Sequence, residues 1–337
     1  MEKSEDKREM KLGTLNLENR YILAPMLNVS TSPYRRFCRK FQKIGLVSVP
    51  MQYTKKIEKN PKSIERELIK IEEERPISIQ LIGSDLKAQK EAINHLESYD
   101  FDVLDINAGC PSQRAIKAKE GGYLMKNLEH MKILIENAVK YSSKPVSLKI
   151  RTGFEKPINI EEVANIINNS GIEFLIIHAR TVKSKFYDDS IDLETVKNLK
   201  EKVLIPVVGN GDIKDILSAK RFVDYTNVDA LMIGRESMGN PEIFNQIHEY
   251  LTSGKEILFK NNMDKMKKYF QLYEDCINEY LTGFSHPQGN KEIKFIELKR
   301  NAIWLTKNIE NSAKYRRNLS TTKNIKQLRT ILDNISE

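Results

Sequence analysis

The most informative reactive side chain in this sequence of 337 residues is Cys110. It lies between Gly109 and Pro111, shortly after an apolar run that ends in Asn107, so a tight loop is expected to fix the thiol in place. A thiol with an ordinary pKa of about 8.5 stays mostly protonated at neutral pH and can act as a general acid. A nucleophilic role is also open, and it would need a nearby base or cation that lowers the thiol pKa.

Cationic side chains end two other apolar runs. Lys149 and Arg151 are two residues apart, so in a strand they point to the same face and can share a ligand. His178 has the same spacing to Arg180 and is either a buried, hydrogen-bonded histidine or a ligand-binding one. No group of Cys, His, Asp and Glu has the spacing of a metal site, and the other two thiols fall within helical patterns that indicate inert, buried cysteines, Cys38 and Cys276.

Two glycine-containing turns predict a phosphate site. Gly209–Asp212 contains Asn210 and Gly211, and Gly234 is followed by Arg235. Such turns expose backbone N–H groups that bind phosphate, and an arginine adds a charge-assisted contact. Together the two turns predict a phosphorylated cofactor or substrate.

The apolar pattern predicts the scaffold that positions these residues. Short runs rich in Val, Ile and Leu alternate with amphipathic stretches, as in a parallel sheet covered by helices. The expected strands are Tyr21–Met26, Gly45–Pro50, Ile77–Ile82, Asp102–Asn107, Val146–Ile150, Glu173–His178, Ile205–Gly209 and Ala230–Gly234. Helices are expected over Pro33–Phe41, Leu86–Glu97, Leu128–Val139, Ile160–Asn168 and Leu193–Leu199.

Eight strands in about 230 residues predict an α/β fold of the (β/α)8 TIM barrel type. An open doubly wound sheet is disfavoured because no G-x-G-x-x-G motif follows the first strand. The polar residues named above, together with Pro25, Met26 and Gln80, fall at the carboxyl ends of the expected strands. In a barrel these ends meet at one face, where catalysis takes place. The bias toward one end predicts an active site there.

After about residue 255 the pattern becomes helical, with helices expected over Asn262–Leu281, Lys291–Asn308 and Thr322–Ile335. We therefore expect a barrel domain over residues 1–250 and a C-terminal all-helical domain over residues 255–337. The helical part carries 16 Lys and Arg against 10 Asp and Glu, which is two-thirds of the net charge of +9. Such an excess attracts polyanions, although an ordinary solvated lysine-rich surface has the same composition.

Composition excludes several classes of protein. Hydrophobic residues make up 40% and charged residues 30%, which is typical of globular rather than disordered or fibrous chains. Three cysteines cannot form a disulfide framework and indicate a reducing, cytoplasmic setting. The charged segment Met1–Lys11 lacks the apolar core of a secretory signal, and no apolar run approaches the ~20 residues of a membrane span.

In barrel order, a set of short motifs resembles the tRNA-dihydrouridine synthases, FMN-dependent enzymes that reduce uridine in tRNA. The likeness covers nearly the whole chain. Its motifs are APMLNVSTSPYR from Ala24, SIQLIGSD around Gln80, DINAGCPS from Asp105 with the following GGYLMKN, SLKIRTG from Ser147, HART from His178, VVGNGDI from Val207 and DALMIGR from Asp229. Alone, APM or GNGDI is weak evidence for the family, but the whole set of motifs in this order is specific to it.

The resemblance implies a role for each matching residue. Cys110 matches the catalytic acid, while Asn107 and Arg180 match positions near the target base, and we assign Arg151 to substrate binding with them. Nine residues match family positions that hold the flavin ring, the ribityl chain or the phosphate, and we add their neighbour Asp212. The predicted cofactor contacts are Pro25, Met26, Gln80, Lys149, His178, Asn210, Gly211, Asp212, Gly234 and Arg235. No metal is expected.

The resemblance also implies a two-step reaction. NADPH or NADH reduces FMN, and the flavin then delivers hydride to C6 of uracil while Cys110 protonates C5. Lys149 beside the flavin is expected to stabilise negative charge on the reduced ring. The expected partners are tRNA and NAD(P)H, with no membrane contact, and a cytoplasmic monomer is expected. The choice of uridine, and of NADPH or NADH, stays open.

A tRNA substrate accounts for the uneven charge. A uridine must leave the base stack to be reduced, and phosphate contacts from the basic helical domain compensate that cost. The candidate contacts are Lys265, Lys267, Lys268, Lys291, Lys294, Lys299, Arg300, Lys314, Arg316 and Arg317.

Two loops depart from the family pattern. Where the family usually reads A-P-M-x-G-V-T-D, this chain has Asn28, Ser30 and Thr31, which keeps a hydroxyl but loses the glycine and the acidic residue. The second strand ends with Val49-Pro50-Met51-Gln52, where a Glu-Met pair is common in the family. Contacts from these loops are therefore left out of the predicted site, apart from Pro25 and Met26.

Two other functions are compatible with the motifs. One is an FMN-dependent oxidoreductase of a free pyrimidine, similar to dihydroorotate dehydrogenases, although such a substrate needs no basic helical domain. The other is a non-catalytic tRNA-binding protein, against which the intact Cys110 and Lys149 argue.

Overall fold

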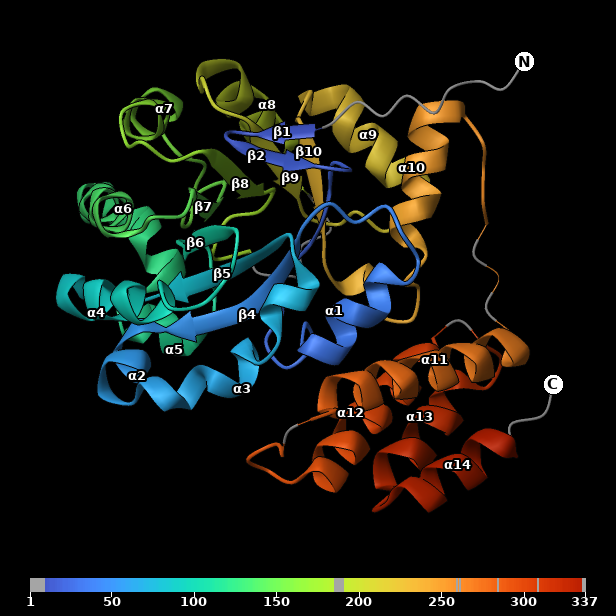
Figure 1. Ribbon diagram of the computed structural model, residues 1–337. Coiled ribbons are helices and arrows are strands. Elements are labelled where there is room, and N and C mark those ends of the chain that lie inside the picture. The colour runs from blue at the N-terminus through green and yellow to red at the C-terminus, as the bar shows by residue number, and fades with distance from the viewer. Residues whose placement is uncertain are drawn as a thin grey trace. The chain divides into compact units, whose positions relative to one another are not determined.

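The computed structural model describes residues 10–184, 191–258, 260, 262–283, 285–307 and 309–334. The chain forms two compact units (Figure 1). The first contains the chain up to Ser30 together with Lys43–Ile233, and the second contains Thr31–Gln42 and the chain from Gly234 onward. In the part of the chain described, no helix combines the length and apolar character that a membrane crossing requires.

The first unit is a closed parallel barrel (Figure 1). Its eight strands are β3 (Tyr21–Leu23), β4 (Val47–Tyr53), β5 (Ile77–Ile82), β6 (Val103–Asn107), β7 (Val146–Arg151), β8 (Phe174–His178), β9 (Val207–Asn210) and β10 (Ala230–Ile233). They pair in the order β3-β10-β9-β8-β7-β6-β5-β4, every pair parallel. The sheet closes between β3 and the start of β4, where the N–H of Gly45 donates to the carbonyl of Tyr21 and the N–H of Leu23 donates to the carbonyl of Leu46, both at 2.9 Å. The predicted TIM barrel is confirmed.

Helices connect successive strands of the barrel. The α-helices of this unit are α2 (Thr54–Lys59), α3 (Glu65–Leu68), α4 (Leu86–Leu96), α5 (Gln113–Lys117), α6 (Leu128–Tyr141), α7 (Ile160–Asn168), α8 (Leu193–Lys202) and α9 (Ile216–Thr226), and its 3-10 turns are η1 (Pro61–Ile64), η2 (Ile71–Glu74) and η3 (Gly121–Lys126). The sequence marks where many of them begin, because an N-cap side chain accepts a hydrogen bond from the first turn in α4, α5, α6, α7, α8 and α9.

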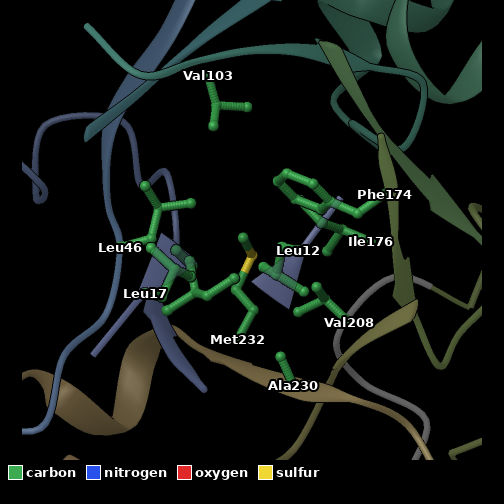
Figure 2. Packing of buried hydrophobic residues seen from close by; sticks show 11 residues of the cluster. Leu12, Leu17, Leu46, Val103, Phe174, Ile176, Val208, Ala230 and Met232 are labelled. Atoms are coloured by element: carbon green, nitrogen blue, oxygen red, sulfur yellow. The ribbon is translucent and has the colours of Figure 1, made fainter. Parts of the chain in front are cut away.

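An apolar cluster fills the amino-terminal end of the barrel (Figure 2). A hairpin that the sequence analysis did not predict, β1 (Met10–Leu12) and β2 (Leu15–Leu17), contributes the buried Leu12 and Leu17. They pack with side chains from the first interior positions of the strands, among them Val103, Phe174 and Ala230. Burying these side chains removes apolar surface from water at this end. The chemistry-bearing side chains lie further along the strands.

The interior side chains of a single strand change from apolar to polar along its length. On β6, Val103 belongs to the apolar cluster, whereas Asp105 and Asn107, two and four residues later, hydrogen-bond with side chains of neighbouring strands. Because successive side chains of a strand point to opposite faces, all three share the interior face. The interior is therefore apolar near the amino ends of the strands and polar near their carboxyl ends.

The second unit is helical. It contains α1 (Ser32–Arg39), η4 (Arg235–Ser237), α10 (Ile243–Ser253), α11 (Met263–Leu281), α12 (Asn290–Leu305), α13 (Ser312–Thr321) and α14 (Ile325–Asp333). Helix α1 packs on α11 through Phe37, whose ring centroid lies 5.3 Å from that of Tyr273 and 6.2 Å from that of Tyr269. Helix α1 follows the first barrel strand in sequence but belongs by its contacts to this unit. The predicted C-terminal helices are present, and the sequence analysis had not anticipated α13.

Candidate active site

The loop that carries Cys110 is held on both sides by hydrogen bonds. The side-chain Oδ1 of Asn107 accepts from the backbone N–H groups of Gly109 at 3.1 Å and Cys110 at 2.9 Å. The carbonyl of Cys110 accepts from the N–H of Gly122 at 3.0 Å. The Cys110 thiol donates to Oγ of Ser112 at 3.4 Å and is partly exposed. The loop therefore fixes a thiol that stays partly accessible, and the role of this thiol stays a prediction.

A close approach explains one glycine beside this loop. Gly121 has a φ of +56°, and a Cβ atom at this position would lie 2.9 Å from Cβ of Cys110. A side chain here would be strained by its backbone conformation and would displace the cysteine. The GG pair that follows the cysteine motif therefore helps to position the thiol.

Lys149 is a largely buried cation on β7. Its ammonium group donates to Oδ1 of Asn210 at 3.0 Å, and the amide of Asn210 donates in turn to the carbonyl of Met232 at 2.7 Å. Burial and, to a smaller extent, the charge of Arg151 lower the pKa of Lys149 to about 8, against the opposing effects of Asp105 and Cys110. Within the described residues Lys149 has no carboxylate at ion-pair distance, so most of its hydrogen-bonding capacity is available to a ligand.

Gln80 and Asn107 form a polar layer next to Lys149. The amide of Asn107 donates to Oε1 of Gln80 at 2.7 Å, and strand pairing places Asn107 opposite Lys149. The Asn107 amide also lies 3.9 Å from the sulfur of Met51, at the end of the second barrel strand. The sequence analysis left out this contact, which comes from β4, because the segment departs from the family pattern.

The two arginines predicted to bind substrate contact protein groups. Arg151 donates from Nε to the carbonyl of Gly109 at 2.8 Å and from Nη1 to the carbonyl of Thr181 at 2.9 Å. Arg180 donates to Oδ2 of Asp212 at 2.5 Å, and both side chains are largely buried. Arg151 therefore ties the cysteine loop to the loop after β8, and contact of either arginine with a substrate stays a prediction.

Gly211 packs closely against Ala179 and His178. Its φ is +117°, and an added Cβ atom would lie 3.2 Å from the backbone nitrogen of Ala179 and 3.4 Å from Cε1 of His178. Pairing of β8 with β9 places His178 opposite Asn210. Side-chain amides and a largely buried ammonium group supply donors that fit a heterocycle with several carbonyl and ring-nitrogen acceptors.

Ser30 closes the loop after β3. The N–H of Met26 donates to Oγ of Ser30 at 2.9 Å, and the hydroxyl donates back to the Met26 carbonyl at 3.3 Å. Asn28 has a φ of +59°, a conformation in which asparagine is tolerated better than most residues. The departures from the family pattern therefore retain a tight loop around Pro25 and Met26.

Gly234 and Arg235 directly follow β10 and begin the second unit, with Arg235 at the start of η4. The turn is held by the N–H of Ser237, which donates to the carbonyl of Gly234 at 3.0 Å. Their role in binding a phosphate stays a prediction.

A parallel barrel with a partly exposed thiol, a buried lysine and converging amides at the carboxyl ends of its strands is the arrangement of a TIM-barrel enzyme. The described residues contain no group of three or more His, Cys, Asp or Glu side chains arranged to hold a metal ion.

Comparison with known proteins identifies the kind of enzyme. The family described as dihydrouridine synthase (Dus) matches residues 22–336. The chain is 35% identical over 247 residues to tRNA-dihydrouridine synthase B of Escherichia coli K12, covering 73% of this chain and 76% of that protein. It is 33% identical over 276 residues to the same enzyme of Vibrio vulnificus CMCP6, covering 81% and 85%. The chain belongs to the dihydrouridine synthase family.

Solved structures share the barrel at low sequence identity. A mutant of morphinone reductase in complex with tetrahydroNAD superposes with a TM-score of 0.52 at 12% identity, covering 72% of this chain and 90% of that one. Histamine dehydrogenase from Rhizobium sp. 4-9 gives 0.53 at 12% identity, covering 72% and 47%. These likenesses concern the fold.

Proposed function

We propose that this enzyme reduces uridine to 5,6-dihydrouridine in tRNA, with FMN as its cofactor and NADPH or NADH as the reductant. The observation that carries the proposal is the arrangement of Cys110 and Lys149: a fixed thiol and a buried ammonium group at the same end of one barrel, joined through Asn107. Membership of the dihydrouridine synthase family supports the same reaction. With tRNA as substrate, the protein acts in the cytoplasm, and we expect it to act as a monomer.

The residues present fit a flavin. Lys149, Gln80 and Asn210 supply donors for the ring, and Gly211 and His178 are proposed to lie beside it. Pro25, Met26 and Asp212 complete the proposed cofactor contacts, with Gly234 and Arg235 as the proposed phosphate ligands. When bound, reduced FMN supplies the hydride that adds to C6 of uracil.

The chain's own residues supply the proton and the orientation. Cys110 donates a proton from Sγ to C5. Its backbone N–H donates to Asn107 and its carbonyl accepts from Gly122, and these bonds hold the loop in place. Lys149, charged at neutral pH, stabilises negative charge that develops on its ligand. Asn107, Arg151 and Arg180 are the proposed contacts around the uracil.

The cofactor and the substrate are tested separately. Purified protein is expected to be yellow, with flavin absorbance at about 450 nm, a property of the cofactor that the protein only tunes. Removal of the gene is expected to eliminate dihydrouridine at defined tRNA positions, as measured by mass spectrometry of nucleosides. Flavin with unchanged dihydrouridine would favour an oxidoreductase of a free pyrimidine, and absence of flavin would favour a tRNA-binding protein without chemistry.

The basic residues of the helical unit divide into two groups. Lys265, Lys294, Lys299 and Arg300 have protein partners, such as Glu274 for Lys294 at 2.9 Å. The other six are exposed and have no ion pair among the described residues: Lys267, Lys268, Lys291, Lys314, Arg316 and Arg317. These six are the better candidates for phosphate contacts.

Reversing two of these charges is expected to weaken tRNA binding. In the double variant Arg316→Glu/Arg317→Glu, the association constant for tRNA should fall by about tenfold or more, with a smaller dependence on salt, because phosphate contacts release counterions. Filter binding at several salt concentrations measures both effects. The matched control reverses two exposed charges on barrel helices, Lys140→Glu/Arg221→Glu. Equal loss in the control would show a general effect of net charge and contradict the assignment.

A further inference from the structure

One buried acidic group in the barrel has no part in the proposed reaction. Asp105 lies on β6 and is 2% exposed. Its Oδ1 accepts from the hydroxyl of Ser147 at 2.7 Å, and its Oδ2 accepts from Nε2 of Gln80 at 2.6 Å. Burying a carboxylate costs several kcal/mol unless hydrogen bonds and opposite charges compensate. A group maintained at such a cost calls for an explanation.

Asp105 begins a chain of hydrogen bonds that ends at the cysteine loop. Gln80 receives a hydrogen bond on Oε1 from Nδ2 of Asn107 at 2.7 Å. Asn107 in turn accepts on Oδ1 from the N–H groups of Gly109 and Cys110. Three side chains from β5 and β6 therefore connect the barrel interior to the backbone of the loop that carries Cys110.

The two ends of this chain determine the orientation of both amides. An ionised carboxylate only accepts, so the NH2 group of Gln80 must face Asp105 and its oxygen must face Asn107. Backbone N–H groups only donate, so the oxygen of Asn107 must face Gly109 and Cys110. With both orientations set in this way, the NH2 group of Asn107 meets the oxygen of Gln80, and the two form a hydrogen bond. Every link is satisfied in one orientation, and a flip of either amide would place two donors or two acceptors together.

We propose that Asp105 is a positioning residue for the reaction, holding the cysteine loop in place through Gln80 and Asn107. The catalytic part of this inference rests on the proposed function, in which Cys110 is the acid. Asp105 is not among the proposed substrate or cofactor contacts. Its carboxylate anchors the end of the chain that lies deepest in the barrel, and a bond to a charged acceptor is stronger than one between neutral groups.

The charge state of Asp105 agrees with this role at neutral pH. Burial raises the pKa of Asp105 to about 6, while the hydrogen bonds from Gln80 and Ser147 and the charge of Lys149 oppose the rise. The charged group that faces Asp105 is thus Lys149, and the polar groups are Gln80 and Ser147. Above about pH 6 the carboxylate is ionised and accepts from Gln80.

The test measures how firmly Cys110 is held, by its rate of alkylation with iodoacetamide in the purified full-length protein. Peptide mass spectrometry separates Cys110 from Cys38 and Cys276, which are buried. Asp105→Ala is expected to raise the alkylation rate of Cys110 by about threefold or more, because the relaxed loop exposes the thiol. Asp105→Asn retains an oxygen that can face Gln80 and is expected to restore a rate within about twofold of the wild type. A rate for Asp105→Ala equal to that of the wild type would overturn the proposal.

Ser147→Ala is the matched control. It removes a hydrogen bond to the same carboxylate but to the other oxygen, outside the chain that leads to Cys110. Its alkylation rate is expected to stay near that of the wild type. A rise equal to that of Asp105→Ala would indicate general loosening of the core and would count against the proposal.

A double-mutant cycle tests whether the residues act in one chain. Asn107→Ala removes the last link, so the double variant Asp105→Ala/Asn107→Ala should react no faster than Asn107→Ala alone. Additive increases in the alkylation rate would contradict a single chain of hydrogen bonds. If Asp105→Ala does not fold, Gln80→Ala breaks the same chain at its middle and takes its place in the cycle.

Turnover gives a second, separate measure. Asp105→Ala is expected to lower kcat for uridine reduction by about tenfold while KM for tRNA changes by less than about twofold, because the phosphate contacts proposed to supply most of the RNA affinity are on the helical unit. Alkylation needs neither tRNA nor a nicotinamide nucleotide. Failure of the proposed function would therefore leave the alkylation result intact, whereas failure of the positioning role would appear in alkylation first.

Discussion

Replacing Cys110 with alanine is expected to lower the rate of uridine reduction by about 10²–10⁴-fold, the range that general acids contribute. The thiol is the partly exposed group at the end of a loop fixed by Asn107, and alanine cannot supply its proton. Formation of dihydrouridine in tRNA from a strain that lacks the gene measures the loss. Flavin absorbance and tRNA affinity should stay within about twofold of the wild type, because this change leaves the hydrogen bond between Lys149 and Asn210 in place.

A control variant must show that the loss of activity is specific to the Cys110 thiol and does not follow from removal of another thiol. Cys276→Ala removes a thiol that is buried in α11 of the helical unit, and it is expected to keep its rate of uridine reduction despite some loss of stability. Undiminished turnover by Cys110→Ala would refute the proton-donating role. Loss of flavin from Cys110→Ala would assign the cysteine to cofactor binding instead.

Replacing Lys149 with methionine is expected to reduce both FMN affinity and the rate of uridine reduction, the latter by about 10²–10³-fold, as when one preorganised electrostatic contact is removed. The ammonium group is buried and bound to Asn210, so its charge is focused on whatever ligand occupies the barrel. Fluorescence titration with FMN measures the affinity, and anaerobic stopped-flow absorbance measures the redox step. Lys202→Met, which removes an exposed lysine paired with Glu161, is the matched control.

The pKa of Lys149 adds a pH dependence with a definite sign. Because burial lowers this pKa to about 8, Lys149 is charged below that pH and becomes neutral above it. A ligand that prefers the charged form binds more weakly as pH rises, so FMN affinity should fall above about pH 8. In Lys149→Arg the guanidinium stays charged throughout this range, and the decline should disappear. A decline of the same size in Lys149→Arg would assign it to another group.

Much of the site is predictable because its residues are marked by local patterns. Cys110 stands out as a thiol beside Gly109 and Pro111, and Lys149 as a cation at the end of an apolar run. Asp105 was part of a quoted motif but received no role. An acidic residue in the middle of an otherwise buried strand was the signal that could have identified it.

The long helices of the second unit could be predicted from the sequence, but the unit to which α1 belongs could not. The periodicity of α11 and α12 was visible along the chain, and both helices lie where it indicated. Nothing in the pattern of α1 distinguished it from the other helices that follow barrel strands. Its membership in the second unit depends on aromatic contacts of Phe37 with Tyr269 and Tyr273, more than 200 positions away in the chain.

The sequence by itself determined the eight strands, the polar character of their carboxyl ends and the identity of the thiol and the lysine. These properties depend on neighbouring residues and on the two-residue period of a strand, which are local. Only the tertiary structure decided that a hairpin fills the amino end of the barrel, that Arg151 ties two loops together and that Asp105 connects to Cys110 through Gln80 and Asn107. Those contacts depend on the register between strands that are distant in the chain, and register is set by how the whole barrel closes.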